Sequence, residues 1–199
     1  DYFQRYQSGF ILDFEGLSKK DMEHAFIKLG TGSLGGKARG VAFMNAMISK
    51  AQLEDKYEQM KVIVPRSFVI GSDIFETFIE ENDLYSFVAS APTEEEIAQR
   101  FMAGSLPDAL QENLRILTKQ IKCPLAVRSS SILEDSRILP FAGIYKTYVV
   151  PNSHQESEIR FRQLSDAVKL VYASVFYASP VRYARNADIR IAEEKMAVL

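Results

Sequence analysis

The segment 125–143 constrains this chain more than any other part of its sequence. It opens with an apolar run, typical of a buried strand, that leads through Arg128 into Ser129 and Ser130. It closes on a Phe-Ala-Gly sequence that ends at Gly143. Arginine presents a planar fork of donors that matches phosphate oxygens, and a glycine lets backbone N–H groups approach an anion closely. We therefore predict that a phosphate group binds at this strand end.

A second phosphate-binding signal lies far upstream, where Gly35 and Gly36 precede Lys37. Apolar residues recur at helical spacing after Lys37, so the glycines are predicted to lead into a helix N-terminus. A nucleotide-binding P-loop is excluded, because Thr31 stands where its first glycine is required and Ala38 stands where its hydroxyl residue is required. The segment is therefore a glycine-flanked lysine of another type than the P-loop.

A dinucleotide-binding fingerprint, G-x-G-x-x-G, is formally present as Gly30, Gly32 and Gly35. The acidic residues Glu54 and Asp55 follow at about the spacing that such sites use for their ribose contact. They precede the second predicted strand rather than ending it, and the residues before Gly30 are predicted to be helical. The surrounding pattern therefore disfavours a dinucleotide site.

Hydrophobic periodicity predicts a mixture of helices and strands. A helix is predicted over residues 19–28, and Thr93 with Glu96 forms a capping box for a later helix. Strands are predicted at 61–64 and 67–70, on either side of a proline bend. The expected fold class is α+β or mixed α/β, in which helices pack on a mixed or antiparallel sheet.

Composition narrows the location and the partners. The formal net charge of −2 lacks the basic excess of nucleic-acid binders, so no nucleic-acid partner is expected. No apolar run is long enough to span a membrane, and no signal peptide opens the chain, so no membrane partner is expected. The single cysteine, Cys123, fits a reducing compartment and is expected to be a buried residue at the start of a strand. We expect a cytoplasmic protein.

Taken together, the motifs resemble a known family. The motifs are Gly35-Gly-Lys37, Val127-Arg-Ser-Ser130, Glu134-Asp135 and Phe141-Ala-Gly143. In this order they resemble the ATP-grasp nucleotide-binding domain of the pyruvate phosphate dikinase and phosphoenolpyruvate synthase family. The resemblance covers about residues 30–199, which implies that residues 1–29 are an N-terminal extension of unknown role. The chain is expected to be the N-terminal part of an ATP-grasp domain, truncated before its C-terminal half.

The resemblance implies which residues hold ATP. In that family the lysine of the glycine motif and the arginine of the Val-Arg-Ser-Ser motif reach the ATP phosphates, which assigns Lys37 and Arg128 as catalytic and ATP-binding residues. The further ATP-binding positions are Gly35, Gly36, Ser129, Ser130 and Gly143. For the two serines, a purely structural role in capping a turn stays equally open.

The implied cofactors are ATP and Mg²⁺. The metal-binding acids of the family belong to the later half of its ATP-grasp domain, so no metal ligand is assigned in this chain. The phosphorylated histidine of the family lies on a separate mobile domain, so His24 and His154 are not catalytic candidates. The isolated chain is expected to be inactive.

The implied function is that of a phosphoenolpyruvate synthase-like phosphotransferase. It would move phosphate from ATP to the histidine of the mobile domain and on to pyruvate. Ala38 and Ile144 depart from the residues that commonly follow the glycine-lysine and Phe-Ala-Gly motifs. Such departures leave two alternatives open, a related dikinase with another small acceptor and a non-catalytic nucleotide-sensing or scaffold module.

Overall fold

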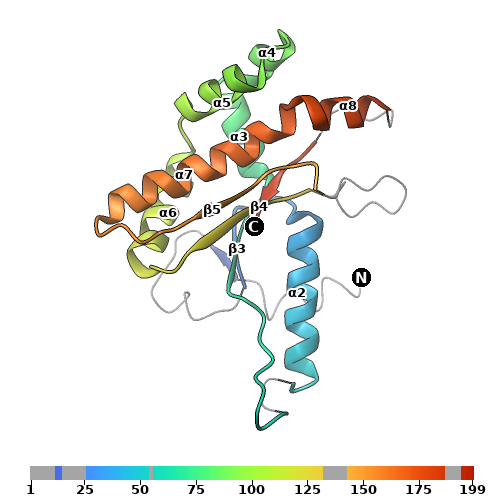
Figure 1. The fold of residues 1–199 in the computed structure, drawn as a ribbon, viewed down its shortest axis with the longest axis vertical. Coiled ribbons are helices and arrows are strands. Elements are labelled where there is room, and N and C mark those ends of the chain that lie inside the picture. Colours follow the sequence, from blue (N-terminus) through green and yellow to red (C-terminus); the bar gives the residue numbers. More distant parts are fainter. Residues whose placement is uncertain (1–11, 15–25, 54–55, 132–142, 187–193) are drawn as a thin grey trace.

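A six-stranded sheet forms the centre of the computed structural model, which describes residues 12–14, 26–53, 56–131, 143–186 and 194–199 (Figure 1). The strands are β1 (Leu12–Phe14), β2 (Phe26–Leu29), β3 (Ser67–Ile70), β4 (Leu125–Ser130), β5 (Thr147–Val150) and β6 (Ala197–Val198). Their order across the sheet is β1-β2-β3-β6-β4-β5. The last strand along the chain therefore lies in the middle of the sheet.

The strand directions bring several connections to one edge of the sheet. Strands β1, β2 and β3 run parallel, and β6 runs antiparallel to both β3 and β4. Strand β4 therefore points the same way as β3, and β5 returns antiparallel to it with Thr147 opposite Arg128. The C-terminal ends of β2, β3 and β4 lie along one border of the sheet, across the strand ends, where β5 and β6 begin. We call this border the edge of the sheet. This mixed sheet confirms the predicted mixed α/β class.

Helices cover both faces of the sheet. They are α2 (Gly35–Lys50), α3 (Ser72–Glu81), α4 (Leu84–Ala89), α5 (Glu94–Ala103), α6 (Asp108–Gln120), α7 (Ser157–Ala173), the 3₁₀ helix η3 (Ser174–Phe176) and α8 (Ala178–Asn186). Helix α2 lies on one face, and α3, α5, α6 and α7 pack on the other (Figure 1). None of the described helices is long and apolar enough to cross a membrane.

Alternating strand residues build two separate cores. Phe26 and Ala197 pack with Ala38 of α2, whereas their neighbours Ile27 and Val198 join the larger core on the opposite face. Successive residues of a strand point to opposite faces, so one short strand supplies both cores. The small side chain of Ala38, which is fully buried, lets α2 lie close to the sheet.

Aromatic rings fill the centre of the larger core. The ring of Phe78 is fully buried, and its centroid lies 5.9 Å from that of Phe101 and 5.6 Å from that of Tyr172. Phe75 meets Tyr172 edge to face at 5.0 Å. These contacts join α3, α5 and α7 into one body and fix the start of α3 relative to the sheet.

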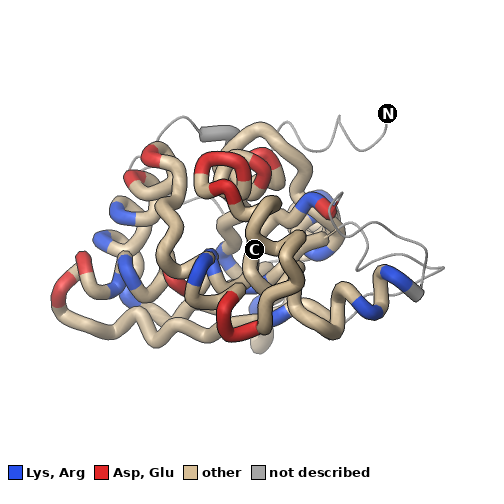
Figure 2. The backbone as a smooth tube through the Cα atoms, turned by 90° about the horizontal axis from the view of Figure 1, so that it is seen from above, with Lys and Arg blue, Asp and Glu red and all other residues tan. Residues whose placement is uncertain are grey.

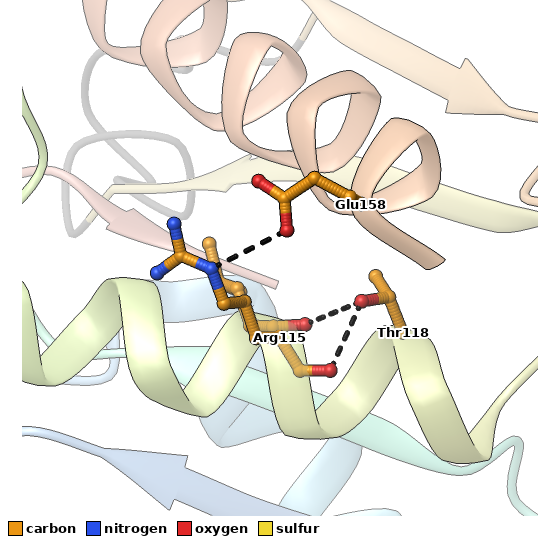
Figure 3. A network of polar contacts seen from close by, with 4 residues as sticks. Arg115, Thr118 and Glu158 are labelled. Carbon is orange, nitrogen blue, oxygen red and sulfur yellow. Dashed lines mark hydrogen bonds and ion pairs between the residues drawn. The ribbon is translucent and has the colours of Figure 1, made fainter. Parts of the chain in front are cut away.

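A polar cluster joins α6 to α7 (Figure 3). Arg115 Nε lies 3.5 Å from Glu158 Oε2, and the guanidinium lies 4.0 Å from the centroid of the Phe161 ring. The Thr118 hydroxyl donates to carbonyl oxygens one turn earlier in α6, and the Thr118 carbonyl accepts from the buried guanidinium of Arg160. The exposed ion pair stabilises little, so the buried arginine is the stronger link between the two helices.

The structure confirms the capping box of α5. The backbone N–H of Thr93 donates to Glu96 Oε2 at 2.7 Å, and the backbone N–H of Glu96 donates to Thr93 Oγ1 at 3.3 Å. The motif that the sequence shows therefore satisfies two backbone N–H groups at this helix start.

The predicted helix over residues 19–28 is wrong at its end. Residues 26–28 belong to β2, which pairs with β1 on one side and β3 on the other, while 19–25 lie outside the described residues. Pairing with two neighbouring strands overrides the local helical pattern. Strands β1 and β2, which precede the start of the ATP-grasp domain expected at residue 30, therefore belong to the same sheet as the strands that follow it.

Two smaller expectations are also wrong. Residues 61–64 form no strand, because they pair with no strand among the described residues. Cys123 is exposed rather than buried, because it lies in the connection before β4 and not within the strand.

We predict that Phe78→Ala lowers the free energy of unfolding by about 3–5 kcal/mol, because it empties the centre of the aromatic core. Urea denaturation measures the change. The control is Met60→Ala, whose side chain is 57% exposed and whose loss is expected to change stability by less than about 0.5 kcal/mol. Equal effects of the two substitutions would contradict the assigned core.

Candidate functional site

Three connections meet at the edge where β2, β3 and β4 end. Helix α2 begins at Gly35 after β2, α3 begins at Ser72 after β3, and Ser131 follows β4. Ligands of α/β proteins commonly bind at the C-terminal ends of parallel strands, because helix N-termini point there. Figure 2 shows basic and acidic positions interspersed along the described backbone. An anion site at this edge therefore depends on a few particular cations.

The first turn of α2 is docked on the end of β4. Gly35 has a φ of +70°, and a Cβ built on it would lie 1.5 Å from the carbonyl oxygen of Ser130. The buried Ser130 hydroxyl donates to the Leu34 carbonyl at 2.7 Å and accepts from the Ala38 N–H at 3.0 Å. The strand end therefore caps the helix, and only glycine at position 35 permits the approach.

The backbone N–H groups of the two glycines bind within the protein. The Gly36 N–H donates to the Ser131 carbonyl at 3.0 Å, and the Gly35 N–H donates to Ser33 Oγ at 3.2 Å. The glycine pair thus holds α2 against the strand end and the preceding loop. Its expected contact with an anion stays a prediction.

Lys37 lies beside β4. Its Nζ donates to the Ser129 carbonyl at 3.1 Å and to Ser129 Oγ at 3.2 Å. The first turn of α2 contains no acidic residue, and a helix N-terminus carries partial positive charge. The ammonium group and the helix therefore place positive charge at the same point on the sheet edge.

Arg128 directly precedes the serine that binds Lys37. Its backbone N–H and carbonyl both bond to Leu199 at 2.8 Å, which fixes its place in the sheet. Its exposed side chain falls on the same face as Ser130, because residues two apart in a strand share a face. Helix α2 docks on that face. The side chain of Ser129, to which Lys37 Nζ donates, points to the other face, so the two predicted cations share the end of β4 but are joined only through this neighbouring residue.

Gly143 lies shortly before β5, which begins at this edge. Its φ of +76° favours glycine, and no described atom lies within 4 Å of a Cβ built on it. Glu134, Asp135 and Phe141 lie outside the described residues. His154 is exposed and follows β5 at the opposite edge.

Asp73 is a residue of this edge that the sequence analysis missed. Its Oδ2 accepts from the Thr31 N–H at 2.8 Å and from Thr31 Oγ1 at 3.0 Å. A Cβ built on Gly30 or on Gly32 would lie 2.7 Å from Oδ1, so these glycines make room for the carboxylate. The available signal was an acid in the first turn of a helix that directly follows a strand.

The sequence analysis also missed a contact near the start of α2. The Ser131 hydroxyl donates to Glu194 Oε1, and both residues are buried. Glu194 reaches this place because β6 begins at the same edge. Its acidic neighbourhood in the sequence resembles a solvated surface segment, so no local signal marks it.

No group of three His, Cys, Asp or Glu side chains in the described ranges is arranged to hold a metal ion. We therefore assign no residue of these ranges to Mg²⁺. A separate groove of about 900 Å³ lies between α4, α5 and α8, with apolar lining that includes Val88, Ile97 and Phe176. None of the predicted site residues lines it.

The fold and the site together define a mixed α/β protein in which a lysine is held at the strand ends, next to the residue that follows an exposed arginine, an arrangement suited to phosphate groups. Residues 31–199 match the family described as the pyruvate phosphate dikinase AMP/ATP-binding domain. The chain belongs to this family, which confirms the resemblance carried by its motifs.

The chain is also similar to the uncharacterized phosphotransferase YvkC of Bacillus subtilis (strain 168). The two are 30% identical over 139 residues, which cover 68% of this chain and 15% of that protein. The chain thus spans a small part of the length of this relative. No solved structure matches the chain.

We predict that Gly35→Ala lowers the free energy of unfolding by more than about 2 kcal/mol, because the new methyl group overlaps the Ser130 carbonyl at a positive φ. The matched control is Gly40→Ala in the same helix, where a Cβ meets no atom within 4 Å. That change is expected to stabilise by about 0.5–1 kcal/mol, because alanine favours helix. Urea denaturation compares them, and a harmless Gly35→Ala would refute the docking.

Asp73 also gives a pH prediction. Partial burial raises the pKa of its carboxyl, but the hydrogen bonds from the Thr31 N–H and hydroxyl, with the N–H groups around the carboxylate, outweigh this effect, so its pKa is lowered. A lowered folded pKa stabilises the protein above the unfolded pKa, and this contribution is lost as pH falls through the folded pKa. The stability difference between wild type and Asp73→Asn should be constant near neutral pH and shrink below about pH 4. Denaturation at several pH values measures it, and a pH-independent difference would contradict the account.

Proposed function

We propose that the chain supplies the phosphate-binding part of an ATP site, in which Lys37 and Arg128 contact the phosphates. The observation that carries this proposal is the Lys37 ammonium held on Ser129, the residue directly after Arg128, at the end of β4. Membership of an AMP/ATP-binding domain family supports the choice of ligand.

The two cations have complementary tasks in this proposal. Arg128 offers the planar fork that binds two phosphate oxygens at once, and Lys37 supplies a compact charge. Phosphoryl transfer spreads negative charge over oxygens that are already present, so fixed positive charge stabilises the transition state without further chemistry. Ser129 orients the amine through its carbonyl and hydroxyl oxygens.

The remaining predicted residues divide by task. We assign Gly35, Gly36 and Ser130 chiefly to setting α2 against β4, because their polar groups are engaged in that contact. Gly143 is proposed to offer its backbone to the phosphates, since it lies at the same edge with a positive φ.

For the complete protein we propose an ATP-dependent phosphotransferase with the ATP-grasp architecture, in the cytoplasm. It would transfer phosphate from ATP, with Mg²⁺ held outside the described ranges, to a histidine on a mobile domain and on to pyruvate or another small acceptor. The relative from Bacillus subtilis, a phosphotransferase by name, supports the reaction class.

We predict that Lys37→Ala and Arg128→Ala each weaken ATP binding by about tenfold to hundredfold, because each removes a charged hydrogen-bond donor. Calorimetric titration of the protein made from its complete gene measures the affinity. The controls are Lys122→Ala and Arg66→Ala, which remove exposed cations just before β4 and β3, at the opposite edge of the sheet.

The controls are expected to bind ATP like the wild type. Equal losses in all four variants would indicate general attraction between opposite charges and would refute the site. ATP binding without phosphate transfer to any histidine would favour the nucleotide-sensing alternative over the enzyme.

A further inference from the structure

The loop that leads into α2 is held by the start of α3. Thr31 donates its backbone N–H and its hydroxyl to one carboxylate oxygen of Asp73, at 2.8 and 3.0 Å. The other oxygen lies so close to Gly30 and Gly32 that a side chain at either position would overlap it. The carboxylate thus fixes a loop whose residues lie 42 positions away in the sequence.

A chain of hydrogen bonds continues from this loop to the proposed ATP site. The N–H of Ser33 donates to Ser72 Oγ, and the N–H of Ser72 donates to the Ser33 carbonyl, both at 3.0 Å. The Ser33 hydroxyl then accepts from the N–H of Gly35, the first residue of α2. Lys37 lies in the first turn of the same helix. The position of its amine therefore depends on how α3 holds the loop.

We propose that Asp73 is a positioning residue, which acts through Thr31 and the loop 30–34 to set the first turn of α2 and the Lys37 amine. The proposal rests on the proposed function for the role of Lys37. Asp73 itself contacts the loop and not the phosphates. Its carboxylate suits this task because a charged acceptor forms stronger hydrogen bonds to N–H and O–H donors than a neutral one does.

The direction of the change in ATP affinity distinguishes a positioning role of Asp73 from a direct electrostatic effect of its charge. A carboxylate near an anion site repels the anion, so removing its charge alone would strengthen ATP binding. Loss of positioning has the opposite effect, because the amine is then no longer held at the strand end. A weaker affinity after removal of Asp73 is therefore specific to the proposed role.

Amide hydrogen exchange tests the proposal without nucleotide. In Asp73→Ala we expect the backbone N–H groups of Thr31 and of residues 35–37 to exchange at least about tenfold faster than in the wild type. The control is Asp108→Ala, which also removes an acid from the first turn of a helix, α6, but has no part in this loop. Unchanged exchange at residues 35–37 in Asp73→Ala, or the same acceleration in Asp108→Ala, would overturn the proposal.

ATP affinity is the second measurement, made by calorimetry on the protein from its complete gene. We expect Asp73→Ala to weaken binding by about tenfold and Asp73→Asn to stay within about threefold of wild type, because the amide oxygen still accepts from Thr31. Equal or tighter binding by Asp73→Ala would overturn the positioning role, as would equal losses in both variants. A wild type that binds no ATP would refute the proposed function alone, and the exchange rates would then decide the role of Asp73.

Discussion

The contact between the first turn of α2 and the end of β4 is the interaction on which the candidate site depends. Gly35 lies so close to the Ser130 carbonyl that no side chain fits between them, and the Ser130 hydroxyl binds the helix backbone in two directions. This contact brings Lys37 next to the residue that follows Arg128. The contact therefore brings two segments that are distant in the sequence, around residues 36 and 129, into one surface.

The direction of the strands explains why this surface lies where it does. Because β2, β3 and β4 point the same way, the helices that follow β2 and β3 begin at the border of the sheet where β4 ends, with β6 between β3 and β4. Helix α3 is anchored in the aromatic core through Phe75 and Phe78, and its first turn is therefore a rigid support. The glycine loop rests on that support through Asp73. The large core on one face thus stabilises a polar arrangement at the edge.

Local patterns in the sequence predicted what depends on local structure. The capping box at Thr93, the mixed fold class and the family follow from motifs that lie within short segments. Strand β2 was missed because its strand character comes from pairing with β1 and β3, which a helical pattern does not reveal. Asp73 was missed for a related reason, since its partner Thr31 is distant in the sequence and an acid at a helix start is common. The sequence thus named the residues that join α2 to β4, whereas Asp73 and Glu194, which bind this region from distant positions, were missed.

The central place of β6 has a consequence for the order in which the chain assembles. In the sheet order, β6 joins β1, β2 and β3 on one side to β4 and β5 on the other among the described strands. When the ribosome adds residue 190, the strands on both sides of β6 have already been made, but β6 itself has not. Such late, long-range pairing is slow to form. The candidate site is therefore completed only after β6 has been made, and until then β3 and β4 expose unpaired backbone groups to which another strand or a chaperone can bind.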